Sequence, residues 1–234
     1  MVTNKSLLLF FIATNLSFSG AEPTTVSSPE IMLQEIESAT KKNSPETTQA
    51  STEERSWYIF TGGPGTGKSS VIAELASRGY QTVQEAATIV IADELKKGEK
   101  TPWSENWFEG KLATIMEIAQ NNLPQNNLQP VFFDRSPLDP LVYIALYEKK
   151  SPTETISKLK NLLSSGKFNP KVFLFNDLGF CKNTAIRHED VAEMLRIENA
   201  MVQHYTLHGF EIIRVPAGTI KDRTDFILSH IKTK

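Results

Sequence analysis

Residues 57–70, WYIFTGGPGTGKSS, constrain the fold of this chain more than any other stretch. Their second half matches the pattern G-x-x-x-x-G-K-[ST] at every fixed position, and a run of aromatic and β-branched residues comes directly before it. Glycines let backbone N–H groups converge on phosphate oxygens without interference from a Cβ atom. The helix after the loop points its positive N-terminal end at the same place. The stretch therefore predicts a phosphate-binding loop between a strand and a helix.

The residues of this loop have expected roles. Lys68 is expected to reach the β- and γ-phosphates of a nucleotide, and the Ser69 hydroxyl is expected to coordinate Mg²⁺. The alternative is a glycine turn that matches the pattern by accident, but the strand before it and the helix after it are the context that the motif requires. The predicted nucleotide-binding residues are Gly62, Gly63, Pro64, Gly65, Thr66, Gly67, Lys68, Ser69 and Ser70.

Strand-like and helix-like segments alternate along the chain, which predicts a three-layer α/β fold around a five-stranded, mostly parallel sheet. The predicted strands are residues 57–61, 80–83, 130–133, 171–176 and 211–215. The predicted helices are residues 68–78, 86–97, 104–123, 138–149, 152–165, 189–208 and 219–231. Ser104 is expected to cap the third of these helices. In such folds ligands bind at the carboxyl ends of the strands, so the residues found there are candidates for one shared site.

The third predicted strand ends in Asp134 and Arg135. An apolar strand that delivers one carboxylate beside a phosphate-binding loop has the Walker B form, so Asp134 is expected to hold Mg²⁺ directly or through water. Arg135 is expected to face the transferring phosphate or the acceptor, where its guanidinium can make bidentate hydrogen bonds. The alternative for Arg135 is a structural ion pair with a nearby carboxylate.

Two more charged residues lie at strand ends. Glu85 comes directly after the second predicted strand and is a candidate to accept the proton of an attacking hydroxyl group; the alternative is that it only caps the next helix. Arg187 lies between the fourth strand and its helix, where a closing lid could bring a cation to the γ-phosphate. The alternative for Arg187 is a solvated side chain. Arg196 and Arg223 are weaker candidates and stay outside the predicted catalytic set.

Trp103, Trp107 and Phe108 form an aromatic group on the expected acceptor side. They are candidates to stack on a ring, but aromatic residues at helical spacing more often belong to a core. A net charge of −2 and a charged fraction of 22% give no indication of a nucleic-acid partner. The single cysteine and the four histidines show no pattern of metal ligands.

The N-terminal region differs in composition from the rest. Residues 1–21 carry one basic residue, an apolar run and a small-x-small site, which favours a signal or targeting segment. The alternatives are an uncleaved apolar tail and a start at Met32. The apolar run is too short for a transmembrane helix. Residues 22–55 are rich in Ser, Thr, Glu and Pro and favour a flexible linker, which leaves residues 56–234 for the folded domain. Export conflicts with a need for ATP unless the protein enters another compartment that contains ATP.

These motifs resemble those of the P-loop AAA-domain family of ATPases and kinases related to the NadR-type nicotinamide-riboside kinase domain. The resemblance rests on GGPGTGKSS, EAA after the second strand, PW, VFFDRSPLDPLVY, R-x-E-D and L-R-I-E. It implies the sheet order 2-3-1-4-5 and a lid that contains Arg187. It also implies that Asp134 and Arg135 match the acidic-Arg pair of related kinases and that Glu85 matches their acceptor-side carboxylate.

Two functional hypotheses are consistent with these residues. The first is an ATP- and Mg²⁺-dependent phosphotransferase that acts on a small nucleoside-like or other hydroxyl-bearing acceptor; ATP is favoured over GTP because no N-K-x-D motif is present. The second is a nucleotide-dependent switch that hydrolyses ATP slowly and binds a protein or lipid partner, with the N-terminal linker as a possible contact surface. The predicted catalytic residues for the first are Lys68, Glu85, Asp134, Arg135 and Arg187, and the predicted metal ligands are Ser69 and Asp134.

Overall fold

A computed structural model describes residues 55–63, 65–123, 129–165, 167–176 and 187–231. The predicted targeting segment, residues 1–21, lies outside the described residues, and so does the predicted linker up to residue 54. No helix in the described ranges is both long enough and apolar enough to cross a membrane. The structure therefore concerns the predicted folded domain.

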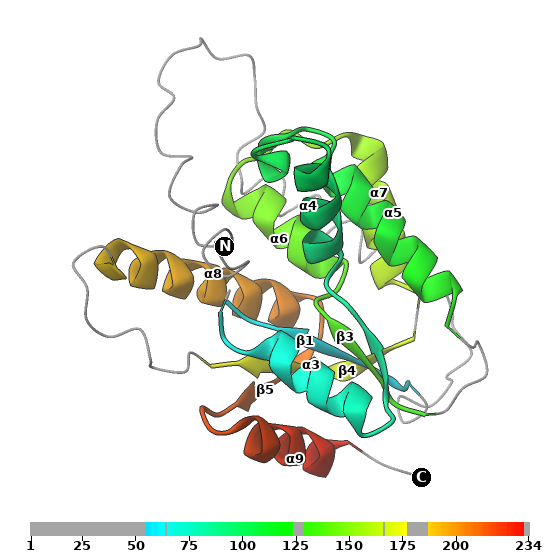
Figure 1. The fold of residues 1–234 in the computed structure, drawn as a ribbon, viewed down its shortest axis with the longest axis vertical. Helices are drawn as coiled ribbons and strands as arrows, with labels where there is room; N and C mark the ends of the chain where they lie inside the picture. The colour runs from blue at the N-terminus through cyan, green and yellow to red at the C-terminus, as the bar shows by residue number, and fades with distance from the viewer. Residues whose placement is uncertain (1–54, 64, 124–128, 166, 177–186, 232–234) are drawn as a thin grey trace.

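A five-stranded sheet forms the centre of this domain, in the order β2-β3-β1-β4-β5 (Figure 1). The strands are β1 (Trp57–Thr61), β2 (Gln81–Val83), β3 (Val131–Asp134), β4 (Phe168–Phe175) and β5 (Glu211–Val215). All neighbouring strands pair in parallel. The predicted fold class and the strand order implied by the resemblance are confirmed.

Helices cover both faces of the sheet (Figure 1). They are α3 (Lys68–Ser77), α4 (Ala86–Lys96), α5 (Phe108–Asn121), α6 (Leu138–Leu146), α7 (Thr153–Leu163), α8 (Arg187–Leu207) and α9 (Ile220–His230), with a 3₁₀ turn, η2 (Pro102–Ser104). Side chains alternate along β1 because successive residues of a strand point to opposite faces. Tyr58 and Phe60 pack in the cluster that contains residues of α3 and α9, whereas Trp57 and Ile59 pack with residues of α5, α6, α7 and α8.

The predicted start of the third helix is wrong. Ser104 ends the 3₁₀ turn η2, and its hydroxyl donates a hydrogen bond to the carbonyl of Thr101 at 2.7 Å. Pro102 can start either kind of helix, but Glu105 has an extended backbone with φ −81° and ψ 140°, so the helical turn ends there. Helix α5 begins only at Phe108, and a bend in the chain separates it from the turn.

Strand β4 begins three residues earlier than the predicted start at residue 171. Its pairing with β1 shifts in register between Trp57 and Ile59, which face Phe168 and Val172. A bulge of this kind lets a strand contain a proline, because the residue at the irregularity is outside the regular ladder of hydrogen bonds. Pro170 lies in that interval and obscured the strand in the sequence.

Candidate active site

The phosphate-binding loop joins the carboxyl end of β1 to the first residue of α3. Gly62 has a φ of 125°, and a Cβ atom placed on it would lie 2.9 Å from the backbone oxygen of Phe175 in β4. Both the backbone conformation and the close approach to β4 therefore require glycine. The Thr66 hydroxyl donates to the carbonyl of Gly63 at 3.0 Å and ties the two sides of the loop together. Pro64 lies outside the described residues.

The Lys68 ammonium group is buried and folds back onto its own loop. Its Nζ donates to the carbonyl oxygens of Gly62 at 3.1 Å and Gly63 at 2.7 Å. Burial and the neighbouring charge of Arg135 lower the pKa of Lys68 to about 8. Nζ also donates to the Thr66 hydroxyl at 3.3 Å, so all its hydrogen-bond partners are uncharged groups of the loop. The cation is therefore poised for an anionic ligand, because phosphate oxygens would replace neutral partners with charged ones.

This pKa leads to a prediction on nucleotide binding. Lys68 is protonated below about pH 8 and loses its proton above it, so the affinity for ATP should fall as the pH rises. If only the charged form binds well, the Kd at pH 9 should be roughly tenfold that at pH 7. Fluorescence titration with a labelled ATP analogue, without Mg²⁺, measures this. The Lys68→Ala variant should bind weakly at both values of pH and show no such slope, and equal wild-type affinities would contradict the prediction.

Ser69 and Asp134 meet beside the loop. The Ser69 hydroxyl donates to Asp134 Oδ2 at 2.7 Å, while Asp134 Oδ1 is buried and has no hydrogen-bond partner. Burial raises the pKa of Asp134 above its ordinary value, and the charge of Lys68 acts in the opposite direction.

This pair suits the chemistry of Mg²⁺. The ion prefers oxygen ligands and usually binds through one or two protein groups together with substrate phosphates and water. Among the described residues no group of three or more His, Cys, Asp or Glu side chains could hold a metal alone. The unpartnered oxygen of Asp134 and the hydroxyl of Ser69 therefore fit an ion that arrives with a nucleotide.

Glu85 and Arg135 form a buried ion pair across the ends of β2 and β3. Arg135 Nε donates to Glu85 Oε1 at 2.6 Å, and the side chains of Glu85 and Arg135 are 13% and 7% exposed respectively. Glu85 stands at the N-cap position of α4, but its side chain makes no capping hydrogen bond to the helix backbone. Its other oxygen accepts a hydrogen bond from the Thr88 hydroxyl at 2.9 Å. The side chain of Glu85 is thus directed at Arg135 and at the hydroxyl of Thr88.

Charge keeps Glu85 ionised. Burial raises its pKa, but the positive charges of Arg135 and Lys68 more than offset that effect, so the pKa of Glu85 lies below its ordinary value. Arg135 itself has a φ of 73°, which is rare for a residue with a side chain. Such strain persists only where surrounding contacts enforce it, and here the ion pair and a 2.9 Å hydrogen bond from its N–H to the carbonyl of Phe60 do so.

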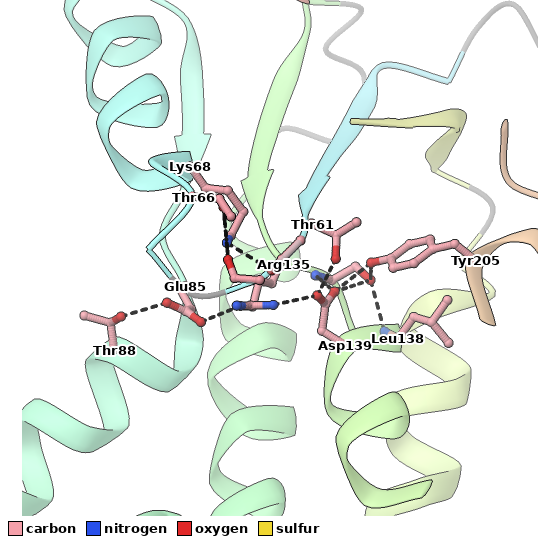
Figure 2. A network of polar contacts seen from close by, with 12 residues as sticks. Thr61, Thr66, Lys68, Glu85, Thr88, Arg135, Leu138, Asp139 and Tyr205 are labelled. Atoms are coloured by element: carbon pink, nitrogen blue, oxygen red, sulfur yellow. Dashed lines mark hydrogen bonds and ion pairs between the residues drawn. The ribbon is translucent and has the colours of Figure 1, made fainter. Parts of the chain in front are cut away.

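A third carboxylate, Asp139, completes the network (Figure 2). Its Oδ1 accepts from Arg135 at 3.1 Å and from the Thr61 hydroxyl at 2.8 Å. Its Oδ2 accepts from the Tyr205 hydroxyl at 2.6 Å and from the Ser136 N–H at 2.9 Å. Asp139 therefore joins the end of β1, the start of α6 and helix α8 to the ion pair. Sequence reasoning missed it, because Arg135 lies before α6 and has a positive φ, so no helical spacing links the two residues.

We predict that Asp139→Asn destabilises the protein by about 2–3 kcal/mol. The amide replaces one accepting oxygen with a donor, so at least one of the buried partners of Asp139 is left without an acceptor. Urea denaturation measures the change. Asp225→Asn is a matched control, because Asp225 pairs with Arg78 and Lys221 at the surface, and its effect should stay below about 1 kcal/mol. Equal effects of the two variants would contradict the prediction.

The sequence of this domain matches a known family, and its fold matches solved structures. A family model described as AAA domain matches residues 57–223. The chain belongs to the AAA-domain family. This confirms the resemblance inferred from the motifs. No curated protein sequence matches the chain.

Solved structures show the same fold. Thymidylate kinase from Ehrlichia chaffeensis is similar with a TM-score of 0.50 and 14% identity, over 75% of this chain and 97% of that one. The NadR protein in complex with NAD and AMP-PNP has a TM-score of 0.49 and 14% identity, over 78% of this chain and 51% of that one. Shikimate kinase from Acinetobacter baumannii, in complex with shikimate, has a TM-score of 0.43 and 18% identity, over 76% of this chain and 93% of that one. The likeness to thymidylate kinase shows that this AAA-domain chain has the fold of a P-loop kinase.

The structure brings Lys68, Glu85, Asp134 and Arg135 together at the carboxyl ends of β1, β2 and β3. For Arg187 only the backbone is described, as the first residue of α8. Its side chain lies outside the described part of the chain, as do residues 177–186 of the predicted lid. Helix α8 passes close to the loop, since a Cβ atom on Gly63 would lie 3.8 Å from Met194 Cε.

Arg223, which sequence reasoning had set aside, contacts the phosphate-binding loop. It is 3% exposed and donates from Nη1 to the carbonyl of Thr66 at 2.8 Å.

The aromatic group of Trp103, Trp107 and Phe108 belongs to the core, as the alternative interpretation predicted. Trp103 and Phe108 are buried in a cluster with residues of α4, and Trp107 packs against its side.

Proposed function

We propose that this AAA-domain protein is an ATP- and Mg²⁺-dependent phosphotransferase that acts on a small hydroxyl-bearing acceptor. One observation carries the proposal. Two carboxylates of the site have different surroundings: Asp134 is buried, accepts from Ser69 and has one oxygen without a partner, whereas Glu85 is 13% exposed and pairs with Arg135. Two carboxylates with different partners suit two different roles in one reaction.

Lys68 and the loop are assigned to the phosphates. The ammonium group of Lys68 would leave the carbonyls of Gly62 and Gly63 and bind the β- and γ-phosphate oxygens. Ser69 and Asp134 are the residues that would hold Mg²⁺, which neutralises charge on the phosphates when it is bound. The P-loop kinase fold and the membership in the AAA-domain family support nucleotide binding at this place.

Glu85 is assigned to the acceptor. The acceptor oxygen forms the new bond to the γ-phosphorus, the bond between that phosphorus and the bridging oxygen breaks, and the hydroxyl proton passes to the Glu85 carboxylate. An ionised carboxylate is needed for this role, and the ion pair with Arg135 keeps Glu85 ionised. Arg135 in turn is fixed by Asp139. The Thr88 hydroxyl donates to the other oxygen of Glu85, so the base is held in place from two sides.

The test is transfer of the γ-phosphate from labelled ATP to a panel of nucleosides and other small alcohols, with Mg²⁺. At least one acceptor should be phosphorylated faster than ATP is hydrolysed in its absence. Hydrolysis that no acceptor accelerates would contradict the proposal. In that case a nucleotide-dependent change in affinity for a protein or a lipid would favour the switch hypothesis.

A further inference from the structure

Arg223 is a buried cation that none of the roles proposed above uses. It is the fourth residue of α9, and this helix packs beside α3. Its Nη1 donates to the carbonyl of Thr66 in the phosphate-binding loop, whereas its Nε and Nη2 are buried without a hydrogen-bond partner. Burial lowers the pKa of Arg223 below its ordinary value, and within the described ranges no carboxylate forms an ion pair with it.

These surroundings disfavour a positive charge in the free protein. A buried charge without an opposite charge opposes folding, and two buried donors without acceptors add to that cost. The position near the start of α9 adds a third unfavourable effect, because the N-terminal end of a helix is itself positive. Native proteins keep few buried polar groups without partners. A ligand that brings negative charge to the loop would offset part of this cost.

The guanidinium group of Arg223 connects one side of the loop to the end of β4. It lies 4.7 Å from the ring centre of Phe175, a distance at which a cation is attracted to an aromatic ring. The other side of the loop meets the same residue, because the backbone of Gly62 approaches the backbone of Phe175 closely. Both sides of the loop are therefore set against Phe175: Gly62 directly, and Thr66 through Arg223.

The hydrogen bond to Thr66 also orients the peptide bond between Thr66 and Gly67. This peptide bond is trans, so its C=O and its N–H point in opposite directions. Since the carbonyl is held by Arg223, the N–H of Gly67 points away from Arg223. Gly67 is the N-cap of α3, and the first N–H groups of a helix have no partner within the helix. The Thr66 hydroxyl accepts from Lys68, so the two cations contact the same loop residue.

We propose that Arg223 is a positioning residue for the phosphates of the nucleotide: it fixes the direction of the Gly67 N–H and adds an unmatched positive charge to the loop. Its effect passes through the peptide bond between Thr66 and Gly67, because its own two remaining donors are buried. A fixed donor and a nearby positive charge both strengthen the binding of an anion. The inference rests on nucleotide binding, which is the first step of the function proposed above.

Two ligands test this role by isothermal titration calorimetry: ATP, and inorganic triphosphate, which has no base and no sugar. Arg223→Met removes the charge and the donors and keeps the length of the side chain. It should raise the Kd for both ligands at least tenfold and by similar factors. An unchanged Kd for both would overturn the inference. A loss confined to ATP would also overturn it, because Arg223 would then act on the nucleoside part.

Two further variants make the result specific. Arg223→Lys keeps the charge and a donor for Thr66, so it should bind both ligands within about threefold of wild type; binding as weak as that of Arg223→Met would overturn the inference. Arg78→Met is the matched control, because Arg78 also joins α3 to α9, through an ion pair with Asp225. It should leave both Kd values unchanged within twofold. Equal losses in Arg78→Met and Arg223→Met would overturn the inference, since the docking of α9 alone would then explain them.

The Tm of the free protein separates positioning from support of the fold. Arg223→Met loses one hydrogen bond and a ring contact, but it also removes an unmatched charge and two donors without partners. Its Tm should therefore stay within about 4 °C of wild type, while the rise in Tm caused by ATP becomes smaller. If Arg223→Met is unstable, Arg223→Gln replaces it, with the same increase in Kd expected. A larger fall in Tm in both variants would show that Arg223 supports the fold and would overturn the inference.

The binding measurements also separate this inference from the proposed function. A wild-type protein that binds ATP through Arg223 as described but phosphorylates no acceptor would contradict the proposed phosphotransferase and leave the inference standing. A wild-type protein that binds neither ATP nor triphosphate would overturn both.

Discussion

Replacement of Lys68 by alanine is expected to lower kcat/KM for phosphate transfer at least about a thousandfold, which corresponds to about 4 kcal/mol. Lys68 is buried, and its hydrogen bonds run to carbonyl groups of the loop and to the Thr66 hydroxyl. In the proposed reaction its ammonium group moves to the phosphates, where negative charge shifts during transfer. The rate of transfer from labelled ATP, measured for wild type and variant on the same acceptor, checks this.

Two controls make the result specific. Lys221→Ala removes a lysine whose side chain is 77% exposed and should leave the rate unchanged. The Tm of Lys68→Ala should not fall, because the lowered pKa of Lys68 means that its buried charge opposes folding near neutral pH. A variant that keeps more than a tenth of the activity would show that Lys68 does not bind the transferring phosphate.

Most elements of this fold could be predicted from the sequence because β1, β3 and β4 carry their own apolar patterns, whereas the short β2, QTV, does not. Strand β1 leads straight into the glycine-rich loop, so local residues determine both the strand and the turn at its end. The order of the strands could not be predicted in this way, because an apolar run indicates a strand but not which strands pair with it. That order came from the resemblance to a known family. Local turn chemistry caused the error at Ser104, where Pro102 starts a 3₁₀ turn.

The site was predictable only in part, for a related reason. Glu85 and Asp134 could be found because parallel strands end at a common edge of the sheet. The residues that fix them come from far along the chain: Thr61 and Tyr205 lie 78 and 66 positions from Asp139, the residue that both contact. No periodicity records a contact over such a separation. Arg223 was set aside for the same reason, because its contact with Thr66 depends on how α9 packs beside α3.

The second large effect is expected for Glu85→Gln, which should reduce the rate of phosphate transfer by about 10²–10⁴. The amide has nearly the shape of the carboxylate but cannot take the proton of the acceptor hydroxyl. The Kd for ATP should change little, because the phosphates are assigned to the loop and to Lys68. Measurement of the transfer rate and of the Kd for ATP on the same sample separates the two effects.

Glu94→Gln is the matched control. It makes the same change in the neighbouring helix α4, at a buried carboxylate that pairs with Lys97 and Lys111 away from the site. Both variants lose ion pairs, so a loss of activity caused by instability alone would appear in both. If Glu85→Gln transfers phosphate at the wild-type rate, Glu85 only pairs with Arg135, and another group takes the proton. A loss confined to Glu85→Gln, with ATP bound as before, identifies this carboxylate as the base and separates a phosphotransferase from a protein that only binds nucleotide.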